Sequence, residues 1–384
     1  MSAPTTNAPL LFLGHAADRT GPPIYLRHFL RWLRAEKPEV DFEVALLLGG
    51  ELLDDFRDLA PTSTCPELPP MPWSDDEMAE VEQLRRVQMA QHAGCEVVHI
   101  NSAPCAELAR LLPPGERVLL SHVHELEIGL SHWLPEVDRQ LLLGDAAQIF
   151  VPAKAVERNL VVNHGVDPGI VAHHPEMVDV REAPPRLDPH ERALARAARG
   201  LPSDGYVVAM SGTVYWRKAF DIFLRLAWEV RDRHGDVPVT FLWLGGEPGA
   251  IGHAERMARV IGVSEIVRFV PTRPDPLEWF QLVDLFALTA REDPFPLVCL
   301  EAASLGVPTV AFDTGGMPEL LDQGCGVVVP YPDVGAMAGA VADLLTDGER
   351  RAALSYRCRE LMRDRYDVSY LAPRLWADIE RWLP

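Results

Sequence analysis

The stretch REDPFPLVCLE, residues 291–301, contains two prolines followed by an apolar run. Pro294 and Pro296 keep the residues before them out of the α region, so we expect a helix to begin at Leu297. The apolar runs at 283–289 and 309–312, which flank this helix, are typical of buried strands. The order strand, loop, helix, strand predicts an α/β sheet, whose ligands bind at the carboxyl ends of the strands.

The start of this helix carries groups that suit a phosphorylated sugar. The backbone N–H groups of Leu297, Val298 and Cys299 have no acceptors within the helix, and the positive helix terminus attracts anions. Asp293 and Glu301 place two carboxylates eight residues apart around the turn, with Glu301 one turn along the Leu297 face. We therefore expect a phosphate and a polyol to bind side by side here.

The segment DPFPLVCLEAASLGVPTVAF, followed by DTGGMPELL, resembles the donor-site core of the retaining GT-B glycosyltransferases of family 4. The signature of that family is an acidic residue, seven others and then Glu, which fits Asp293 and Glu301. The resemblance implies that Asp293 and Phe295 bind the donor sugar and that Glu301 binds the ribose. It also implies that the glycines at 315–316 let the chain pass close to the donor phosphates. The family usually has Glu at the first position and glycines in place of both prolines, so two backbone donors are missing here.

A second group of candidates lies in SGTVYWRKAFD, residues 211–221, where a strand is expected to pass through a loop into a helix. Gly212 permits close backbone approach, and the adjacent cations Arg217 and Lys218 can reach a diphosphate. Taken alone, these cations would also fit a solvated helix start. The stretch resembles the G-R…K-G motif of the family, with Lys218 at the lysine position and Thr213 where arginine is common. We expect Arg217 to supply the missing charge.

Two histidines follow another expected strand, at 118–122. His122 and His124 point the same way if the strand continues, and next to Glu125 they suit a metal in principle, although a third convincing ligand is lacking. The resemblance instead places His124 at the N-domain histidine that faces the donor sugar across an interdomain cleft, and leaves His122 a packing residue. Further candidates are His15, Gly21, His122 and Glu125 for the acceptor or cleft, and Thr272 and Arg273 for the base.

Length and composition predict two α/β domains. The chain has 384 residues, of which 48% are hydrophobic and 24% charged, enough for two cores. Strands alternate with helices, and the pattern restarts at Tyr206. We expect a Rossmann-like acceptor domain at 1–183, a Pro-, Arg- and Ala-rich linker at 184–204, a Rossmann-like donor domain at 205–366 and a C-terminal helix at 367–384. The resemblance implies the GT-B architecture: two doubly wound domains face each other across a cleft, and the last helix crosses back to the first domain.

Charge and targeting signals restrict the partners. Residues 1–183 hold 14 Lys+Arg against 28 Asp+Glu, net −14, and the rest 22 against 28, net −6. This acidity disfavours nucleic acid and anionic bilayers and favours a soluble, uncharged or amine-bearing acceptor; it would also be explained by solubility alone.

No run of 18 apolar residues and no signal peptide is found, so we expect a cytoplasmic protein. Six scattered cysteines indicate reduced thiols. Peripheral membrane contact and the oligomeric state stay open.

These features predict a retaining glycosyltransferase that moves a sugar from a nucleoside-diphosphate sugar to an acceptor hydroxyl. The leaving diphosphate gains negative charge, which Lys218, Arg217 and the helix start at Leu297 would stabilise. No D-x-D triplet occurs, so we expect no metal and no cofactor. Two alternatives stay open: a GT-B nucleotide-sugar 2-epimerase, and a non-catalytic GT-B binding protein. A nicotinamide dehydrogenase is disfavoured because no G-x-G-x-x-G follows the first strand.

Overall fold

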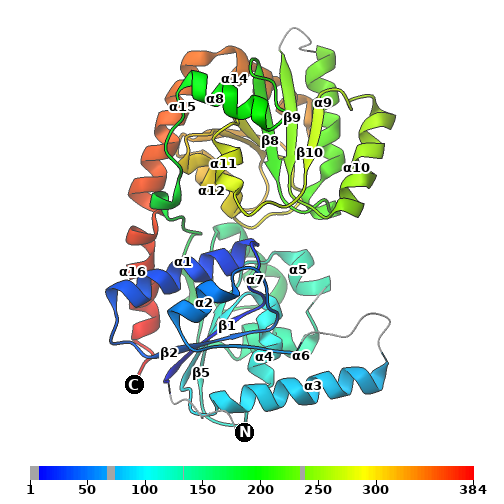
Figure 1. The fold of residues 1–384 in the computed structure, drawn as a ribbon. Helices are drawn as coiled ribbons and strands as arrows, with labels where there is room; N and C mark the ends of the chain where they lie inside the picture. Colours follow the sequence, from blue (N-terminus) through cyan, green and yellow to red (C-terminus); the bar gives the residue numbers. More distant parts are fainter. Residues whose placement is uncertain (1–7, 67–73, 133, 234–237) are drawn as a thin grey trace. The chain divides into compact units, whose positions relative to one another are not determined.

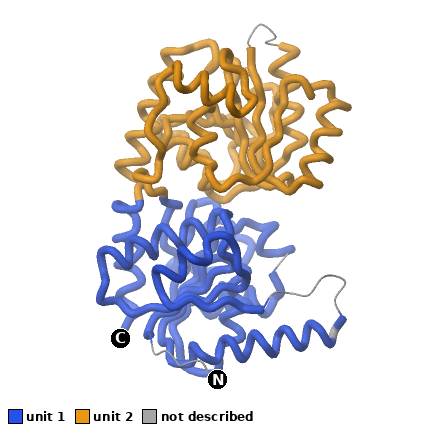
Figure 2. Tube along the Cα trace, in the orientation of Figure 1, with its two compact units in different colours: residues 1–177, 368–384 blue, residues 178–367 orange. Residues whose placement is uncertain are grey.

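The computed structural model describes residues 8–66, 74–132, 134–233 and 238–384 of the chain (Figure 1). Contacts divide the chain into two compact units (Figure 2): unit 1 is residues 1–177 with 368–384, and unit 2 is residues 178–367. Each unit has its own parallel sheet with helices, as predicted for two Rossmann-like domains. Within the described ranges, every helix is too short or too polar to span a bilayer. All six cysteines are buried free thiols, as predicted.

Unit 1 has a seven-stranded sheet in the order β3-β2-β1-β4-β5-β6-β7. Its strands are β1 (Leu10–Gly14), β2 (Phe42–Leu46), β3 (Thr62–Thr64), β4 (Val97–Asn101), β5 (Val118–His122), β6 (Gln148–Val151) and β7 (Val171–His173). Its helices are α1 (Gly21–Glu36), α2 (Leu53–Leu59), α3 (Asp75–Met89), α4 (Ala106–Arg110), α5 (Glu127–His132), α6 (Glu136–Arg139), α7 (Lys154–His164) and α16 (Val368–Glu380). The strand order reverses between β1 and β4, which makes the carboxyl ends of these two strands the switch point of the sheet.

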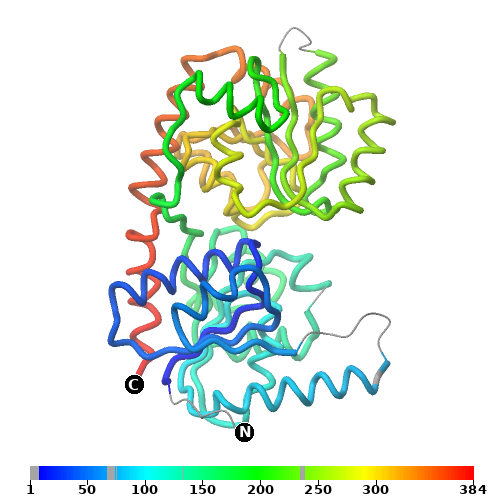
Figure 3. Tube along the Cα trace, viewed as in Figure 1, coloured from blue at the N-terminus to red at the C-terminus, as the bar shows by residue number. Residues whose placement is uncertain are grey.

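The last helix returns to the first part of the chain, as the blue and red segments of Figure 3 show. Helix α16 packs against α1 within unit 1, because Leu371, Leu375 and Ile379 recur every fourth residue and are buried. This contact is the one expected for the C-terminal helix. Helix α1 begins at Gly21, directly before two prolines, because prolines fit the first turn of a helix.

Unit 2 has a six-stranded parallel sheet in the order β10-β9-β8-β11-β12-β13. Its strands are β8 (Tyr206–Ser211), β9 (Val239–Leu244), β10 (Val267–Val270), β11 (Leu285–Leu288), β12 (Thr309–Phe312) and β13 (Gly326–Val329). Its helices are α8 (Pro189–Ala198), α9 (Phe220–Arg233), α10 (Pro248–Ile261), α11 (Pro276–Phe280), α12 (Leu297–Ser304), α13 (Met317–Leu321), α14 (Val334–Thr346) and α15 (Gly348–Leu361). The switch point of this sheet lies between β8 and β11, whose register pairs Leu285 with Val208.

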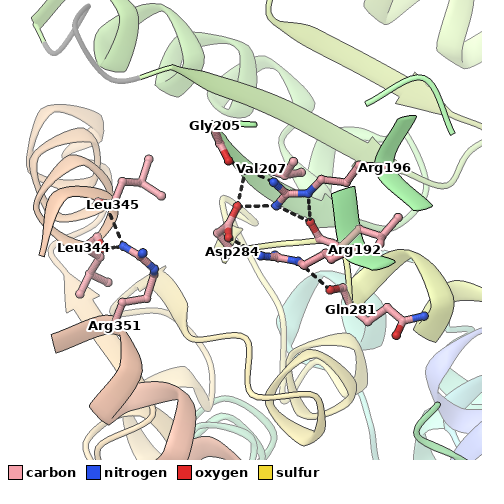
Figure 4. Close-up of polar contacts among 10 residues, drawn as sticks. Arg192, Arg196, Gly205, Val207, Gln281, Asp284, Leu344, Leu345 and Arg351 are labelled. Carbon is pink, nitrogen blue, oxygen red and sulfur yellow. Dashed lines mark hydrogen bonds and ion pairs between the residues drawn. The ribbon is translucent and has the colours of Figure 1, made fainter. Parts of the chain in front are cut away.

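The segment expected as a linker, 184–204, contains a helix that is built into unit 2 (Figure 4). Asp188 caps α8 in a capping box with Glu191. Arg192 and Arg196 of α8 bind Asp284, at 2.9 Å and 2.6 Å. The division between the units falls after Met177, earlier than the expected boundary at residue 183. Residues 189–198 are thus a helix of unit 2 and not a linker. The composition of the segment could not show this, because the arginines are held by Asp284, which lies far along the chain.

Three strands were not predicted, namely the four-residue β13 of unit 2 and two shorter strands of unit 1. Strand β3 lies in the proline-rich stretch at 61–76, and residues 67–73 of that stretch lie outside the described residues. Strand β7 follows a 3₁₀ turn at Pro168–Ile170. Both have three residues, which is too short for an alternating pattern to stand out.

Candidate functional site

The loop between β8 and α9 directs Lys218 across the carboxyl end of the sheet. Gly212 has φ 146°, and a Cβ at this position would lie 3.3 Å from the side-chain carbons of Lys218. Residues Trp216–Lys218 form a 3₁₀ turn that ends at Ala219, which is left-handed with φ 58°. Glycine at 212 therefore leaves the space in which the aliphatic part of Lys218 lies.

Lys218 reaches the second predicted loop. Its Nζ lies 2.5 Å from Oδ2 of Asp293, and both side chains are largely buried. Arg217 donates from Nη1 to the carbonyl of Glu292 at 2.9 Å and lies 3.9 Å from Oδ1 of Asp293. Three residues predicted from two separate motifs are thus brought together. We call Arg217, Lys218 and Asp293 the cation–carboxylate site.

The position of this site follows from the sheet order. Lys218 follows β8 and Asp293 follows β11, the two strands between which the order reverses. Helices that leave such strands go to opposite faces of the sheet, so a crevice opens between the loops at their carboxyl ends. The site therefore lies where ligands of doubly wound sheets bind.

Two residues that sequence reasoning missed hold the two loops together. The Arg291 guanidinium binds both carboxylate oxygens of Asp221, at 2.9 Å and 2.5 Å. It also donates to the carbonyl of Trp216 at 2.7 Å and lies 5.1 Å from the centre of the Trp216 ring. The backbone N–H of Arg291 donates to Arg217 at 2.9 Å. The sequence shows only that Arg291 and Asp221 have opposite charges. That they pair could not be predicted, because the fold brings together two residues that are 70 positions apart.

Helix α12 begins at Leu297, as predicted, with Pro296 as the N-cap. The number of free N–H groups is smaller than expected, because Cys299 donates to the carbonyl of Pro296 at 3.0 Å. The N–H groups of Leu297 and Val298 have no acceptor among the described residues. These two donors lie at the positive end of the helix dipole, beside the loop that carries Asp293.

Phe295, a predicted donor-sugar residue, packs within unit 2. Its ring is buried and stacks on Tyr366, with ring centres 6.0 Å apart. The glycine pair 315–316 passes close to the same loop, since a Cβ on Gly315 would lie 1.7 Å from the carbonyl oxygen of Asp293. Glycine at 315 is therefore required by the packing of the chain against this loop. Burial raises the pKa of the nearby Cys299 thiol well above its ordinary value, and the charge of Asp293 adds to this effect.

The predicted base region lies at the end of β10. Thr272 exchanges two hydrogen bonds with Gly246, one from the Gly246 N–H to Oγ1 at 3.2 Å and one from its own N–H at 3.4 Å. Arg273 is exposed and lies 3.9 Å from Asp275. A Cβ on Gly245 would lie 2.7 Å from the Gly212 carbonyl oxygen, so this glycine pair is required for packing. Glu301 is half-buried on α12, one turn beyond Leu297.

In unit 1 the histidines gather at the carboxyl edge of the sheet. His122 and His124 stack with ring centres 4.2 Å apart and an interplanar angle of 14°, so they point the same way, as predicted. Burial lowers the pKa of His122 well below its ordinary value, and the His124 charge adds to this effect. Burial also acts to lower the pKa of His124, but the charge of Glu176 and its hydrogen bond outweigh burial and raise it. No group of three or more His, Cys, Asp or Glu suited to a metal occurs among the described residues.

Two of the remaining candidates of unit 1, His15 and Glu125, have hydrogen-bond partners within the unit. His15 lies within hydrogen-bond distance of Ser102 Oγ, 3.0 Å from Nδ1, and burial lowers its pKa. Glu125 accepts from the Ala103 N–H at 3.0 Å. Gly21 is the first residue of α1, and a Cβ there would meet nothing within 4 Å, so this position does not require glycine.

Comparison with known proteins assigns the C-terminal half. Residues 205–347, which include the cation–carboxylate site, match the sequence profile described as Glycosyl transferases group 1. This segment belongs to that family. The D-inositol 3-phosphate glycosyltransferase of Corynebacterium kroppenstedtii is 31% identical over 225 residues, 56% of this chain and 49% of that protein. The enzyme of the same name from Mycobacterium sp. (strain KMS) is 34% identical over 236 residues, 58% and 51%. The chain thus spans about half the length of the curated relatives it matches.

Similarity in structure extends over nearly the whole chain. Anabaena Alr3699/HepE, solved in complex with UDP and glucose, superposes with a TM-score of 0.77 at 18% identity and covers 97% of this chain and 99% of its own. At this identity the likeness shows the fold, which is the predicted GT-B class.

Proposed function

We propose that the protein is a glycosyltransferase that moves a sugar from a nucleoside-diphosphate sugar to an acceptor hydroxyl. The observation that carries the proposal is the cation–carboxylate site at the switch point of unit 2, next to the free N–H groups at the start of α12. Family membership of residues 205–347 and the names of the relatives support it. Because Alr3699/HepE was solved with UDP, UDP-sugars are the first donors to test.

The site suggests how a donor would be bound. Asp293 neutralises Lys218 through the 2.5 Å contact. A diphosphate carries more charge than one carboxylate and would compete for Lys218 and Arg217 while the N–H groups of Leu297 and Val298 bind another of its oxygens. Asp293 is then released to accept a hydrogen bond from a sugar hydroxyl. Stabilisation of the leaving diphosphate by these groups lowers the barrier to breaking the anomeric C–O bond.

The same proposal includes the stereochemistry of transfer, the groups that balance the charge of the diphosphate, and the charge of the acceptor. Retention of anomeric configuration is implied by the resemblance, with the departing phosphate acting as the base for the acceptor hydroxyl. We propose that protein cations, in place of a metal, balance the charge of the diphosphate. His124 is the residue of unit 1 for which we propose a role in transfer. The acidity of residues 1–183 favours a neutral or amine-bearing acceptor, which the dependence of its KM on ionic strength would test.

A panel of UDP-, GDP- and dTDP-sugars, incubated with the protein and analysed by mass spectrometry and NMR, tests this function. A transferase is expected to hydrolyse its donor slowly when no acceptor is present and to release the nucleoside diphosphate. Release of an epimerised nucleotide sugar would identify a 2-epimerase instead. A protein that neither binds nor turns over any donor in the panel would contradict the proposal.

Binding by variants separates the two carboxylates of the motif. Glu301→Gln is expected to weaken both the donor and the free nucleoside diphosphate by roughly 10- to 100-fold, because a hydrogen bond from a ribose hydroxyl to a charged group contributes about 1.5–3 kcal/mol. Asp293→Asn is expected to spare the nucleoside diphosphate, or to tighten its binding, because Lys218 is freed, and to weaken the donor. Isothermal calorimetry measures all four affinities.

Glu349→Gln, an exposed carboxylate in the first turn of α15, serves as the control and should change neither affinity. Equal losses of nucleoside diphosphate binding in Glu301→Gln and Asp293→Asn would show that the assignment of Asp293 to the sugar and Glu301 to the ribose is wrong.

A further inference from the structure

His124 is held in unit 1 by one strong and one weak contact. Nδ1 lies 2.6 Å from Oε1 of Glu176, and both side chains are buried. Nε2 lies 3.3 Å from Oδ1 of Asn101, which is beyond the usual 2.7–3.2 Å range of N–H···O bonds. The other oxygen of Glu176, Oε2, has no partner among the described residues. Among the described residues, the Glu176 carboxylate therefore has His124 as its hydrogen-bond partner.

The orientation of Asn101 fixes the proton on Nε2. Its Nδ2 donates to the carbonyl of Pro22 at 2.9 Å, and a carbonyl can only accept. The amide oxygen of Asn101 must therefore face His124, so Nε2 has to be the donor. When Glu176 is ionised, Nδ1 must also donate, to the carboxylate 2.6 Å away, and the ring is then a doubly protonated imidazolium.

The surroundings of His124 allow this charge chiefly because of Glu176, to which the charge of Glu125 adds a smaller effect. The ring lies face to face with His122 and has the edge of Tyr25 against it, 5.2 Å away. Without Glu176, burial alone would lower the pKa of His124. The titratable groups that surround or interact electrostatically with it are Tyr25, His15, His99, His122, Glu125 and Glu176.

We propose that Glu176 is a positioning residue that keeps His124 doubly protonated, so that its Nε2–H, weakly held by Asn101, can donate a hydrogen bond to a ligand hydroxyl instead. The short bond at Nδ1 fixes the ring plane, and the long bond at Nε2 is the one that a ligand oxygen replaces at little cost. This inference rests on the proposed function in that the hydroxyl belongs to a sugar. Glu176 follows β7 and was part of no motif, so sequence reasoning did not assign it a role.

Histidine NMR of the full chain tests the pair without any substrate. The His124 resonance is assigned as the one lost in His124→Gln. In the wild type we expect His124 to titrate above 6.5 with both nitrogens protonated below its pKa; in Glu176→Gln it should titrate below 6.5, and Glu176→Asp should restore part of the difference. A His124 pKa that is unchanged by Glu176→Gln would overturn the inference.

Transfer kinetics test the consequence for activity. At pH values between the His124 pKa of Glu176→Gln and the His124 pKa of the wild type, kcat of the variant should fall about tenfold per pH unit relative to the wild type. The reason is that the fraction of variant molecules with a protonated His124 falls by that factor. At a pH below both values the rates should converge, and Glu176→Asp should recover activity. A pH-independent loss in Glu176→Gln would show that Glu176 only stabilises the fold.

Glu43→Gln is the matched control. Glu43 and His92 form a second buried pair at 2.5 Å, near the amino ends of the strands of the same sheet. This change should lower the melting temperature without altering the pH profile of kcat. Equal pH profiles in Glu43→Gln and Glu176→Gln would overturn the inference. If the wild type transferred no sugar from any donor, the proposed function would fail, and the NMR titration would still decide whether Glu176 controls His124.

Discussion

Lys218→Ala is expected to lower the turnover number of transfer by roughly 10²- to 10³-fold, the usual loss when one group that stabilises transition-state charge is removed. Lys218 is the cation closest to Asp293 at the switch point of unit 2. Arg217 lies 3.9 Å from the same carboxylate, so one of the two cations remains in the variant. The measurement is kcat at saturating donor, with circular dichroism to verify folding.

The contact with Asp293 requires a second variant. Lys218→Ala leaves the buried Asp293 carboxylate without its closest partner, which costs stability by itself. Lys218→Ala/Asp293→Asn removes both charges and should recover stability but not turnover. Lys37→Ala, at the C-terminal end of α1 in unit 1, is the control and should keep wild-type turnover. Recovery of turnover in the double variant would show that Lys218 serves only to neutralise Asp293.

The sequence predicted the elements whose signals are local. Strand β12 and the starts of β8 and α12 lie where predicted, because each begins directly after a glycine or a proline. Lys218 and Asp293 were both identified, each by its place after a strand. What the sequence did not contain is their mutual contact, since 75 residues separate them and only the strand order brings β8 beside β11.

Residues that act through distant partners could not be found in this way. Asp284 was read as part of a buried strand, but β11 begins at Leu285, and Asp284 instead accepts hydrogen bonds from α8. Glu176 was part of no motif, yet it binds His124 across 52 residues of sequence. In each case the residue type gave no signal, because a carboxylate in a loop is ordinarily solvated.

Asp284→Ala is expected to destabilise unit 2 by about 3–5 kcal/mol, the usual cost of removing one partner of a buried ion pair. Oδ2 of Asp284 accepts from Arg196 at 2.6 Å and from the Val207 N–H at 2.7 Å, while Oδ1 accepts from Arg192 at 2.9 Å (Figure 4). Arg196 is buried and keeps only carbonyl partners, Leu282 and Gly205, when the carboxylate is gone. The Val207 N–H in β8 loses its acceptor, which adds a desolvation cost.

Hydrogen exchange followed by mass spectrometry measures this loss in each unit separately, which a single unfolding curve of a two-unit chain does not. Peptides from α8 and β8 should lose protection in Asp284→Ala, and peptides from β1 and β4 of unit 1 should not. Asp284→Asn keeps the shape and one acceptor but loses the charge, so its loss should be smaller. Asp343→Ala, an exposed carboxylate on α14, is the control and should change stability by less than about 0.5 kcal/mol. If α8 and β8 kept wild-type protection in Asp284→Ala, the arginines would be held by their carbonyl partners alone, and α8 would be docked by its apolar contacts rather than by this carboxylate.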